Sequence, residues 1–376
     1  MGKIWQQANA SGILAAALAA LLVLALPGQG DAQDGASPDE RRILLIESQP
    51  RAYSILESSG RSEQSRVRLV ALEAAQHAPD AAFDIARRGL ADENPAVRFA
   101  ALVTIGELRL ERLSDAAGDM LRDPNPSVRA AAIYALSRCG EDVDLNPLAR
   151  MLASDSPSTR ANAALIVGRL GDPQAMGMLA EMAGLEMPRV STAERQWVRL
   201  QFAEAMIRLD PDNEEVLVTI RAALYSPLQD LRVLAIQIIG EVGDESVIEG
   251  LAFMIEEDNP IQVRIAAAQA VARMGSQRGA QALIDASDYD TAQLRRDLQG
   301  YLRNLEGESS ERQAIQEILG DPALQTRAAA EVRAQAAIAM GWLESPAAAR
   351  RLAEMMDDPD PIVQVAAASS ILRLSR

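Results

Sequence analysis

Few side chains in this sequence are suited to metal or acid–base chemistry. His77 is the single histidine among the 376 residues. One imidazole cannot complete a zinc or iron site that relies on several histidines. The sequence contains no Gly-x-Ser-x-Gly segment, and a nucleophile activated by histidine would depend on His77 alone. We therefore expect no catalytic residues, no metal and no cofactor.

Methionine is concentrated in residues 176–187, where Met176, Met178 and Met182 lie close together. Met178 and Met182 are four residues apart and share one face of a helix, so we favour packing in a helix core. Methionines can also form an adaptable apolar groove for a partner helix, or bind copper(I) in an exported protein. The three methionines are therefore candidate partner-binding residues.

Arginine recurs at regular intervals along the chain. The intervals are 30 to 39 residues long, and Gln364 takes the tenth place. The nine arginines are Arg68, Arg98, Arg129, Arg160, Arg199, Arg232, Arg264, Arg295 and Arg333. Intervals of this length are typical of helical repeat proteins.

Aspartate precedes several of these positions by six residues. Such an aspartate can accept hydrogen bonds from the free N–H groups at a helix start, while the arginine bridges to it or to the aspartate of the adjacent repeat. We predict a structural ladder along the repeats. Its members are Asp92, Arg98, Asp123, Arg129, Arg160, Arg232, Asp258, Arg264 and Arg333. A row of arginines that binds phosphates or carboxylates is the functional alternative.

Two repeats are longer than the others. The first carries extra residues near 183–195, including Arg189, and the second near 320–332, including Arg327. Extra length in a repeat array falls in loops on one face, which is often the binding face. Arg189 and Arg327 are therefore candidate partner-binding residues, with neutral variation in length as the alternative.

The elements that hold these side chains are helices. Residues seven and ten positions after each ladder position are apolar in all ten repeats, which makes a single stripe on a helix. A capping residue followed by proline predicts helix starts at Asn94-Pro95, Asn125-Pro126, Ser156-Pro157, Ser226-Pro227, Asn259-Pro260 and Asp360-Pro361. Glycine predicts helix ends at Gly140, Gly171, Gly243 and Gly275. A second apolar run follows each end, so every repeat is a pair of antiparallel helices.

The segments PAVRFAALVTIGEL (95–108), STRANAALIVGRLGD (158–172), LRVLAIQIIGEVGD (231–244) and VRIAAAQAVARMG (263–275) resemble HEAT-like repeats, in particular the short variant first described in phycobilin lyases. The resemblance covers about residues 60–376. It implies an all-α fold, a right-handed α–α superhelix of about ten helix pairs. Another HEAT-like enzyme, deoxyhypusine hydroxylase, binds iron through several His-Glu pairs, and this sequence has none.

The two ends of the chain differ from the repeats. Residues 13–26 are an apolar run, and Gly30-Asp31-Ala32 offers a cleavage site, so residues 1–32 are predicted to be a signal peptide. Residues 33–61 are predicted to be a linker and a cap of two short helices that shields the first repeat, with 62–376 forming the repeat array. The array ends on half a repeat, whose flank we expect to be exposed.

The net charge is −16, from 37 basic and 53 acidic residues. An acidic surface repels nucleic acids and anionic lipids, and it favours a cationic protein or peptide as the partner. We expect an exported protein, periplasmic or extracellular, that serves as a scaffold or adaptor without stable membrane insertion and without catalysis. The alternatives are a lyase-like or enzyme-accessory role and a methionine-based role in metal handling.

Overall fold

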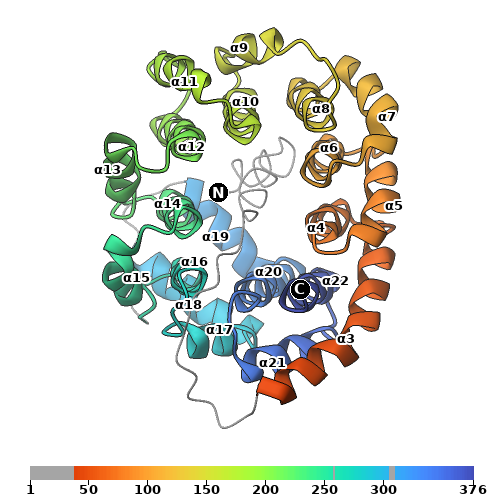
Figure 1. Cartoon of the computed structure of the whole chain (residues 1–376). Coiled ribbons are helices and arrows are strands. Elements are labelled where there is room, and N and C mark those ends of the chain that lie inside the picture. Colours follow the sequence, from red (N-terminus) through yellow and green to blue (C-terminus); the bar gives the residue numbers. More distant parts are fainter. Residues whose placement is uncertain (1–37, 257–258, 305–309) are drawn as a thin grey trace. The chain divides into compact units, whose positions relative to one another are not determined.

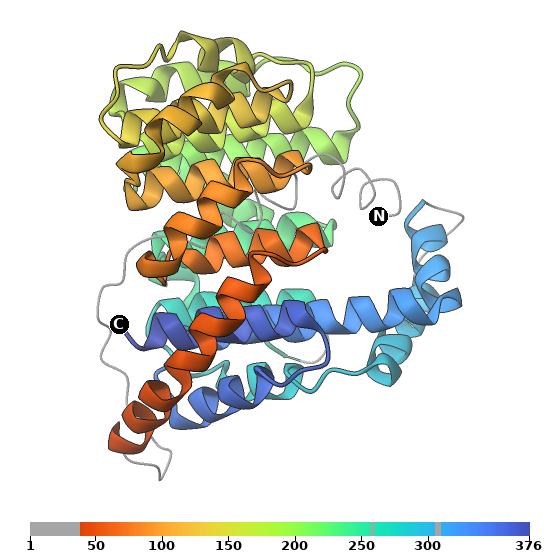
Figure 2. The same ribbon diagram turned by 90° about the vertical axis from the view of Figure 1, so that its right-hand side faces the viewer.

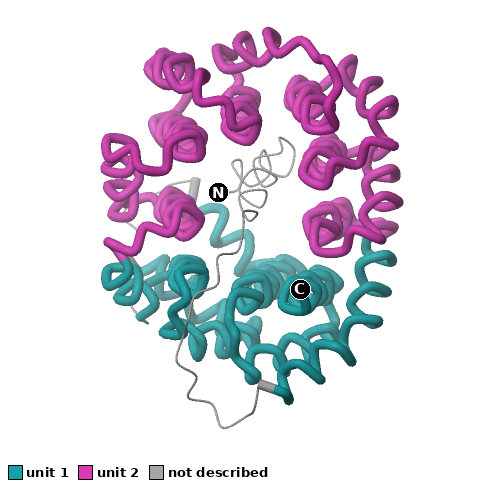
Figure 3. Tube along the Cα trace, viewed as in Figure 1, with its two compact units in different colours: residues 1–13, 26–59, 248–376 teal, residues 14–25, 60–247 magenta. Residues whose placement is uncertain are grey.

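The computed structural model describes residues 38–256, 259–304 and 310–376. Within these ranges the regular structure is made of helices, and no β-strand is present. The all-α class, built of stacked helix pairs as in an α–α superhelix, is confirmed. The helices form two compact units (Figure 3): unit 2 spans residues 60–247, and unit 1 combines 38–59 with 248–376. The predicted signal peptide and Asp258 lie outside the described residues.

Unit 2 is a row of helix pairs (Figure 1). Its first helices are α4 (Ser65–Ala75), α6 (Pro95–Leu108), α8 (Pro126–Arg138), α10 (Pro157–Leu170), α12 (Thr192–Leu209) and α14 (Gln229–Val242). Its second helices are α5 (Pro79–Gly89), α7 (Ser114–Asp119), α9 (Asn146–Leu152), α11 (Met176–Ala183) and α13 (Glu214–Ala223), and its 3-10 turns are η1 (Glu111–Leu113), η2 (Met120–Arg122), η3 (Pro173–Ala175) and η4 (Glu245–Val247). Each first helix packs on the next one along the row.

Unit 1 contains the remaining helices. They are α3 (Pro38–Ser59), α15 (Ile248–Met254), α16 (Ile261–Arg273), α17 (Ala280–Ala286), α18 (Thr291–Asn304), α19 (Ser310–Gly320), α20 (Pro322–Met340), α21 (Pro346–Met355) and α22 (Pro361–Leu374). Helix α20 packs on both α16 and α22, so the first helices of three repeats are in direct contact here.

The small residue three positions after the ladder arginine allows the close stacking. Ala101, Ala132 and Ala163 are fully buried at this place in α6, α8 and α10. Close approach also explains Gly168, because a Cβ added there would lie 2.8 Å from Cα of Ala205 on α12. Neighbouring first helices therefore pack through small side chains.

The helix boundaries follow most of the local signals. Asn94, Asn125, Ser156 and Asp360 cap their helices through their side chains. Gly140, Gly171, Gly243 and Gly275 all take a positive φ just after a helix, as predicted. Two predicted starts are wrong: α14 begins at Gln229 with Leu228 as its N-cap, and α16 begins at Ile261 with Pro260 as its N-cap. In both repeats the proline stays in the preceding turn.

The N-terminal cap differs from the prediction in two ways. Helix α3 is one helix that continues through Pro50, where two short helices were predicted. It packs on α21 and on α22, the helix of the final half repeat, and crosses α22 obliquely (Figure 2). The continuous helix is stabilised by burial of three apolar side chains in the core, those of Leu45, Ala52 and Leu56. The flank of the final half repeat, predicted to be exposed, is thus covered by α3.

The second insert also differs from the prediction. Residues 322–332, predicted to lie in a loop, form the first turns of α20, with Asp321 as its N-cap. The first insert does form a loop between α11 and α12, and it ends at a capping box of Ser191 and Glu194. None of the described helices is both long and apolar enough to cross a bilayer.

Candidate functional site

Ladder rungs join successive repeats at three arginines. Arg98 donates through Nε and Nη2 to both carboxylate oxygens of Asp123 on the next repeat, at 2.8 and 3.1 Å. Its Nη1 donates to the main-chain oxygens of Asp92 and Glu93 in its own repeat, at 2.8 and 3.1 Å. The same bidentate pairing links Arg68 to Asp92 and Arg333 to Asp358. These three arginines therefore connect adjacent repeats by ion pairs.

The other arginines keep only part of this arrangement. Arg129 donates to the carbonyls of Asp123 and Pro124. The position that carries the aspartate in other repeats is occupied by Ser154 in the next repeat. Arg232 binds the carbonyls of Ser226 and Pro227, and Arg264 binds that of Ile255 at 3.0 Å. Gln364 likewise donates to the carbonyl of Asp358, at 2.7 Å.

Arg160 binds the main chain at the start of the first insert. Its Nη2 donates to the main-chain oxygens of Met182, in the last turn of α11, and of Leu185, just after that helix. Burial lowers the pKa of its guanidinium, and nearby Asp155 opposes that shift. Arg195, four residues before Arg199, binds the carbonyl of Val190, so the insert has displaced the ladder in this repeat.

The candidate partner-binding residues are divided between the two units. Met176, Met178 and Met182 lie together on α11, each half-buried at the edge of a core in which only Leu179 of that helix is fully enclosed. Arg189 is exposed in the loop that follows. Arg327 lies in unit 1, on α20, where its Nε is 3.6 Å from a carboxylate oxygen of Glu331.

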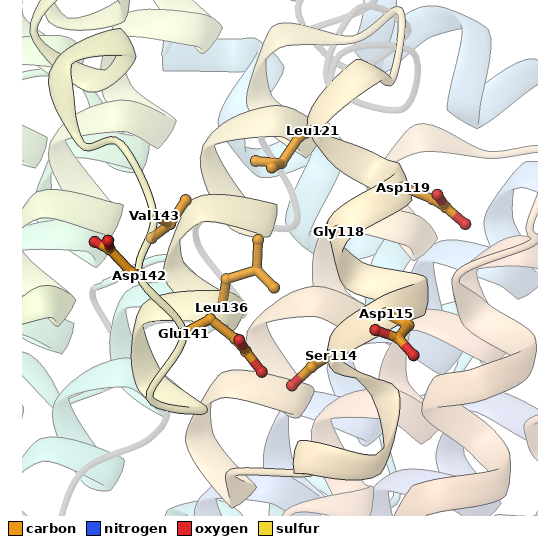
Figure 4. Close-up of a pocket in the computed structure, with 9 residues that line it drawn as sticks. All are labelled: Ser114, Asp115, Gly118, Asp119, Leu121, Leu136, Glu141, Asp142 and Val143. Atoms are coloured by element: carbon orange, nitrogen blue, oxygen red, sulfur yellow. The ribbon is translucent and has the colours of Figure 1, made fainter.

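An acidic hollow lies in unit 2. It has a volume of about 410 Å³ and lies between α7 and the segment that follows α8. Its apolar wall consists of Leu121, Leu136 and Val143, and Ser114 is buried at one end (Figure 4). Its remaining lining residues are Gly118 and four carboxylates: Asp115, Asp119, Glu141 and Asp142.

The four carboxylates are spread around the hollow. In Figure 4, Glu141 and Asp115 lie on either side of Ser114, whereas Asp119 and Asp142 point outward at opposite rims. All four are exposed, and none forms an ion pair within the described ranges. The hollow thus combines an apolar wall with uncompensated negative charge.

The single cysteine lies beside this hollow. Cys139 is half-buried and free of any disulfide. Burial raises the pKa of its thiol, and the negative charges of Glu111 and Glu141 add to that effect. The thiol therefore stays protonated near neutral pH, which makes it a poor nucleophile.

A second polar cluster crosses the first helices of unit 2. Glu107 accepts hydrogen bonds from the hydroxyl of Tyr134 and from Arg169, both at 2.6 Å. Arg208 pairs with Glu204 at 2.9 Å and with Glu241 of the next repeat. Burial would lower the pKa of Arg208, but Glu241 and Glu204 outweigh it and raise that pKa. These charges are paired, which identifies the cluster as a structural layer.

Glu73 lies near Arg169 of this cluster, and its pKa is also shifted. Burial raises the pKa of its carboxyl to about 8, and the positive charge of Arg169 only partly opposes this. One of its carboxylate oxygens is enclosed and makes no hydrogen bond. Glu73 therefore carries a proton at neutral pH.

Sequence reasoning missed both polar features. The cluster follows a pattern, because Glu107, Arg169, Arg208 and Glu241 each lie nine residues after a ladder arginine. That spacing falls on the flank of the apolar stripe and could have been recognised. The hollow has a weaker signal, since its carboxylates come from two repeats and meet only when α7 and α8 pack.

In the described part of the chain, no three His, Cys, Asp or Glu residues are grouped to hold a metal ion.

Comparison with known proteins identifies the repeats. A family model described as HEAT repeats matches residues 50–137, 89–160, 114–196 and 215–303. No curated protein matches this sequence.

The solved structures that are similar to this chain include two HEAT-like proteins. The complex of CpcE and CpcF of phycocyanin lyase from Nostoc sp. PCC7120 is 18% identical with a TM-score of 0.36, over 63% of this chain and 93% of that one. Human deoxyhypusine hydroxylase in complex with glycerol is 14% identical with a TM-score of 0.34, over 90% of this chain and 99% of that one.

Proposed function

Since the chain belongs to the HEAT-repeat family, we propose that it is an exported scaffold that binds a protein partner through a basic segment and catalyses no reaction itself. The observation that carries this proposal is the acidic hollow of unit 2. A side chain of arginine or lysine fits it by its two parts, because the aliphatic stem can pack on Leu136 and Val143 while the cation meets Glu141 and Asp115.

The charge of the whole chain supports a basic partner. At a net charge of −16 the protein attracts cationic segments over a distance and repels nucleic acids. Two leucines near the hollow, Leu121 and Leu145, are 37% and 45% exposed and offer apolar contact beside the carboxylates. A partner held this way should dissociate as salt is raised.

The absence of catalysis is part of the proposal. Its support is that the Cys139 thiol stays protonated near neutral pH, and that no three His, Cys, Asp or Glu residues are grouped to hold a metal ion within the described ranges. Export rests on the sequence of residues 1–32, and fractionation with N-terminal sequencing tests it: we expect a mature chain beginning at Gln33 outside the cytosol. An intact N-terminus in the cytosol would contradict export.

Binding at the hollow is tested with a fluorescent peptide that alternates arginine and glycine, followed by anisotropy at low and high salt. Glu141→Lys places a cation in the hollow and should weaken binding at least tenfold. The matched control is Glu181→Lys, the same charge change at an exposed position of α11. Equal effects of the two variants would mean that only net charge matters, and the hollow would lose its role.

A further inference from the structure

Two arginines and a tryptophan meet in unit 1, where three first helices pack together. Arg273 ends α16, Trp342 follows α20, and Arg373 lies in the last turn of α22. Each is nine residues after a ladder position, namely Arg264, Arg333 and Gln364. Direct packing of α20 on both α16 and α22 brings the three side chains together.

Both guanidinium groups stack on the same indole ring. Cζ of Arg273 lies 4.2 Å from the ring centroid of Trp342, and Cζ of Arg373 lies over that ring as well. The face of an indole attracts a cation, so the ring holds each guanidinium in place. The ring carries no net charge, and the two like charges repel each other.

Arg373 differs from Arg333 and Arg351, two other partly buried arginines of unit 1. Arg333 is paired with Asp358, and Arg351 with Asp288 and Glu354. The guanidinium of Arg373 makes neither an ion pair nor a hydrogen bond with any residue in the described ranges. Burial, together with the positive charge of Arg273, lowers its pKa to about 8. Since arginine keeps its proton in proteins, this marks a cation without its counter-charge.

We propose that Arg273, Trp342 and Arg373 form a binding site for an oxyanion, a carboxylate or phosphate group of a ligand. Guanidinium groups bind such groups through two parallel hydrogen bonds, and the indole fixes their planes in advance. An anion there would supply the charge that Arg373 lacks. The site is independent of the acidic hollow and would take a ligand of opposite charge.

The full chain is titrated with two probes, inorganic phosphate and glutarate, at constant ionic strength. Tryptophan fluorescence is recorded in a Trp197→Phe background, and a Trp342→Phe chain gives the signal to subtract. We expect a saturable change with a Kd in the millimolar range, on the order of 1 mM, as for a small anion held by two cations. A response to phosphate alone, to glutarate alone or to both supports the site and tells which anion it prefers.

Arg373→Gln should weaken binding at least tenfold. Arg278→Gln is the matched control, because Arg278 is exposed on the same unit and already paired with Glu249 at 2.6 Å, and it should change binding less than twofold. Thermal unfolding separates the site from a structural stack. A site predicts that phosphate or glutarate raises the Tm of the parent chain and not that of Arg373→Gln. No response of the parent chain to either anion, or a response that Arg373→Gln leaves intact, would overturn the proposal.

Discussion

The ladder makes a quantitative prediction, because two of its arginines differ in one interaction. Arg98 and Arg129 both donate to two carbonyls of the turn before their own helix. Only Arg98 also pairs with an aspartate of the next repeat, Asp123. Replacing each arginine by alanine therefore removes the same carbonyl contacts, and the difference between the two variants measures the inter-repeat pair.

The size of that difference follows from burial. The side chains of Arg98 and Asp123 are 14% and 5% exposed, so the alanine variant leaves a carboxylate largely shielded from water. Breaking a buried pair costs about 3–5 kcal/mol, and the remaining exposure reduces this to about 2–3 kcal/mol. The carbonyl contacts, worth about 1 kcal/mol each, cancel in the comparison.

Hydrogen exchange is the suitable assay, since repeats open locally and a single unfolding free energy is ill-defined for such arrays. A loss of about 2–3 kcal/mol corresponds to exchange about 30- to 150-fold faster in peptides from α6 and α8. Arg98→Ala should show this acceleration relative to Arg129→Ala. The double variant Arg98→Ala, Asp123→Ala should exchange more slowly than Arg98→Ala, because it leaves no buried carboxylate without its cation. Equal exchange in the two single variants would refute the ladder as a source of stability.

Three further predictions concern packing and protonation. Leu56→Ala in α3, at a fully buried position, should cost about 2–5 kcal/mol and appear as faster exchange of α3 together with α22. Gly168→Ala should lower the Tm because its Cβ would meet Ala205 at 2.8 Å, whereas Gly177→Ala, with no atom within 4 Å, should leave it equal or higher. The pKa of Glu73 is about 8 in the folded chain against an ordinary 4.5, so the folded state holds the extra proton and stability should fall as pH rises between these values. Glu73→Gln should flatten that slope in a series of thermal melts, and a slope that stays the same would exclude Glu73 as its source.

The sequence predicts what depends on neighbours along the chain. Helix ends at Gly140 and Gly171 follow from a local need for positive φ, which glycine meets without strain. The start at Asn94-Pro95 follows from side-chain capping. The same rule fails at Asn259-Pro260, because α16 begins one residue after the proline. A capping pair fixes a helix start only to within the turn that contains it.

Contacts between distant segments are not encoded in that way. Helix α3 meets α22 across most of the chain, and Arg51 pairs with Asp357 at a separation of 306 residues. The apolar residues of α3 do not specify which repeat they will cover. The prediction of a cap on the first repeat rests on adjacency along the chain, but α3 packs instead on α21 and α22.

The role of each arginine is decided by the charge that the neighbouring repeat supplies. Arg98 finds Asp123 and becomes part of the ladder, while Arg160 finds only carbonyls and holds the insert. Arg373 finds an indole and another cation. Arg373 shares its residue type and spacing with Arg169 and Arg208, which are paired with glutamates, so neither property can separate a structural arginine from a binding one. The discriminating quantity is the missing counter-charge at a partly buried cation, and it becomes visible only when the helices of successive repeats are packed.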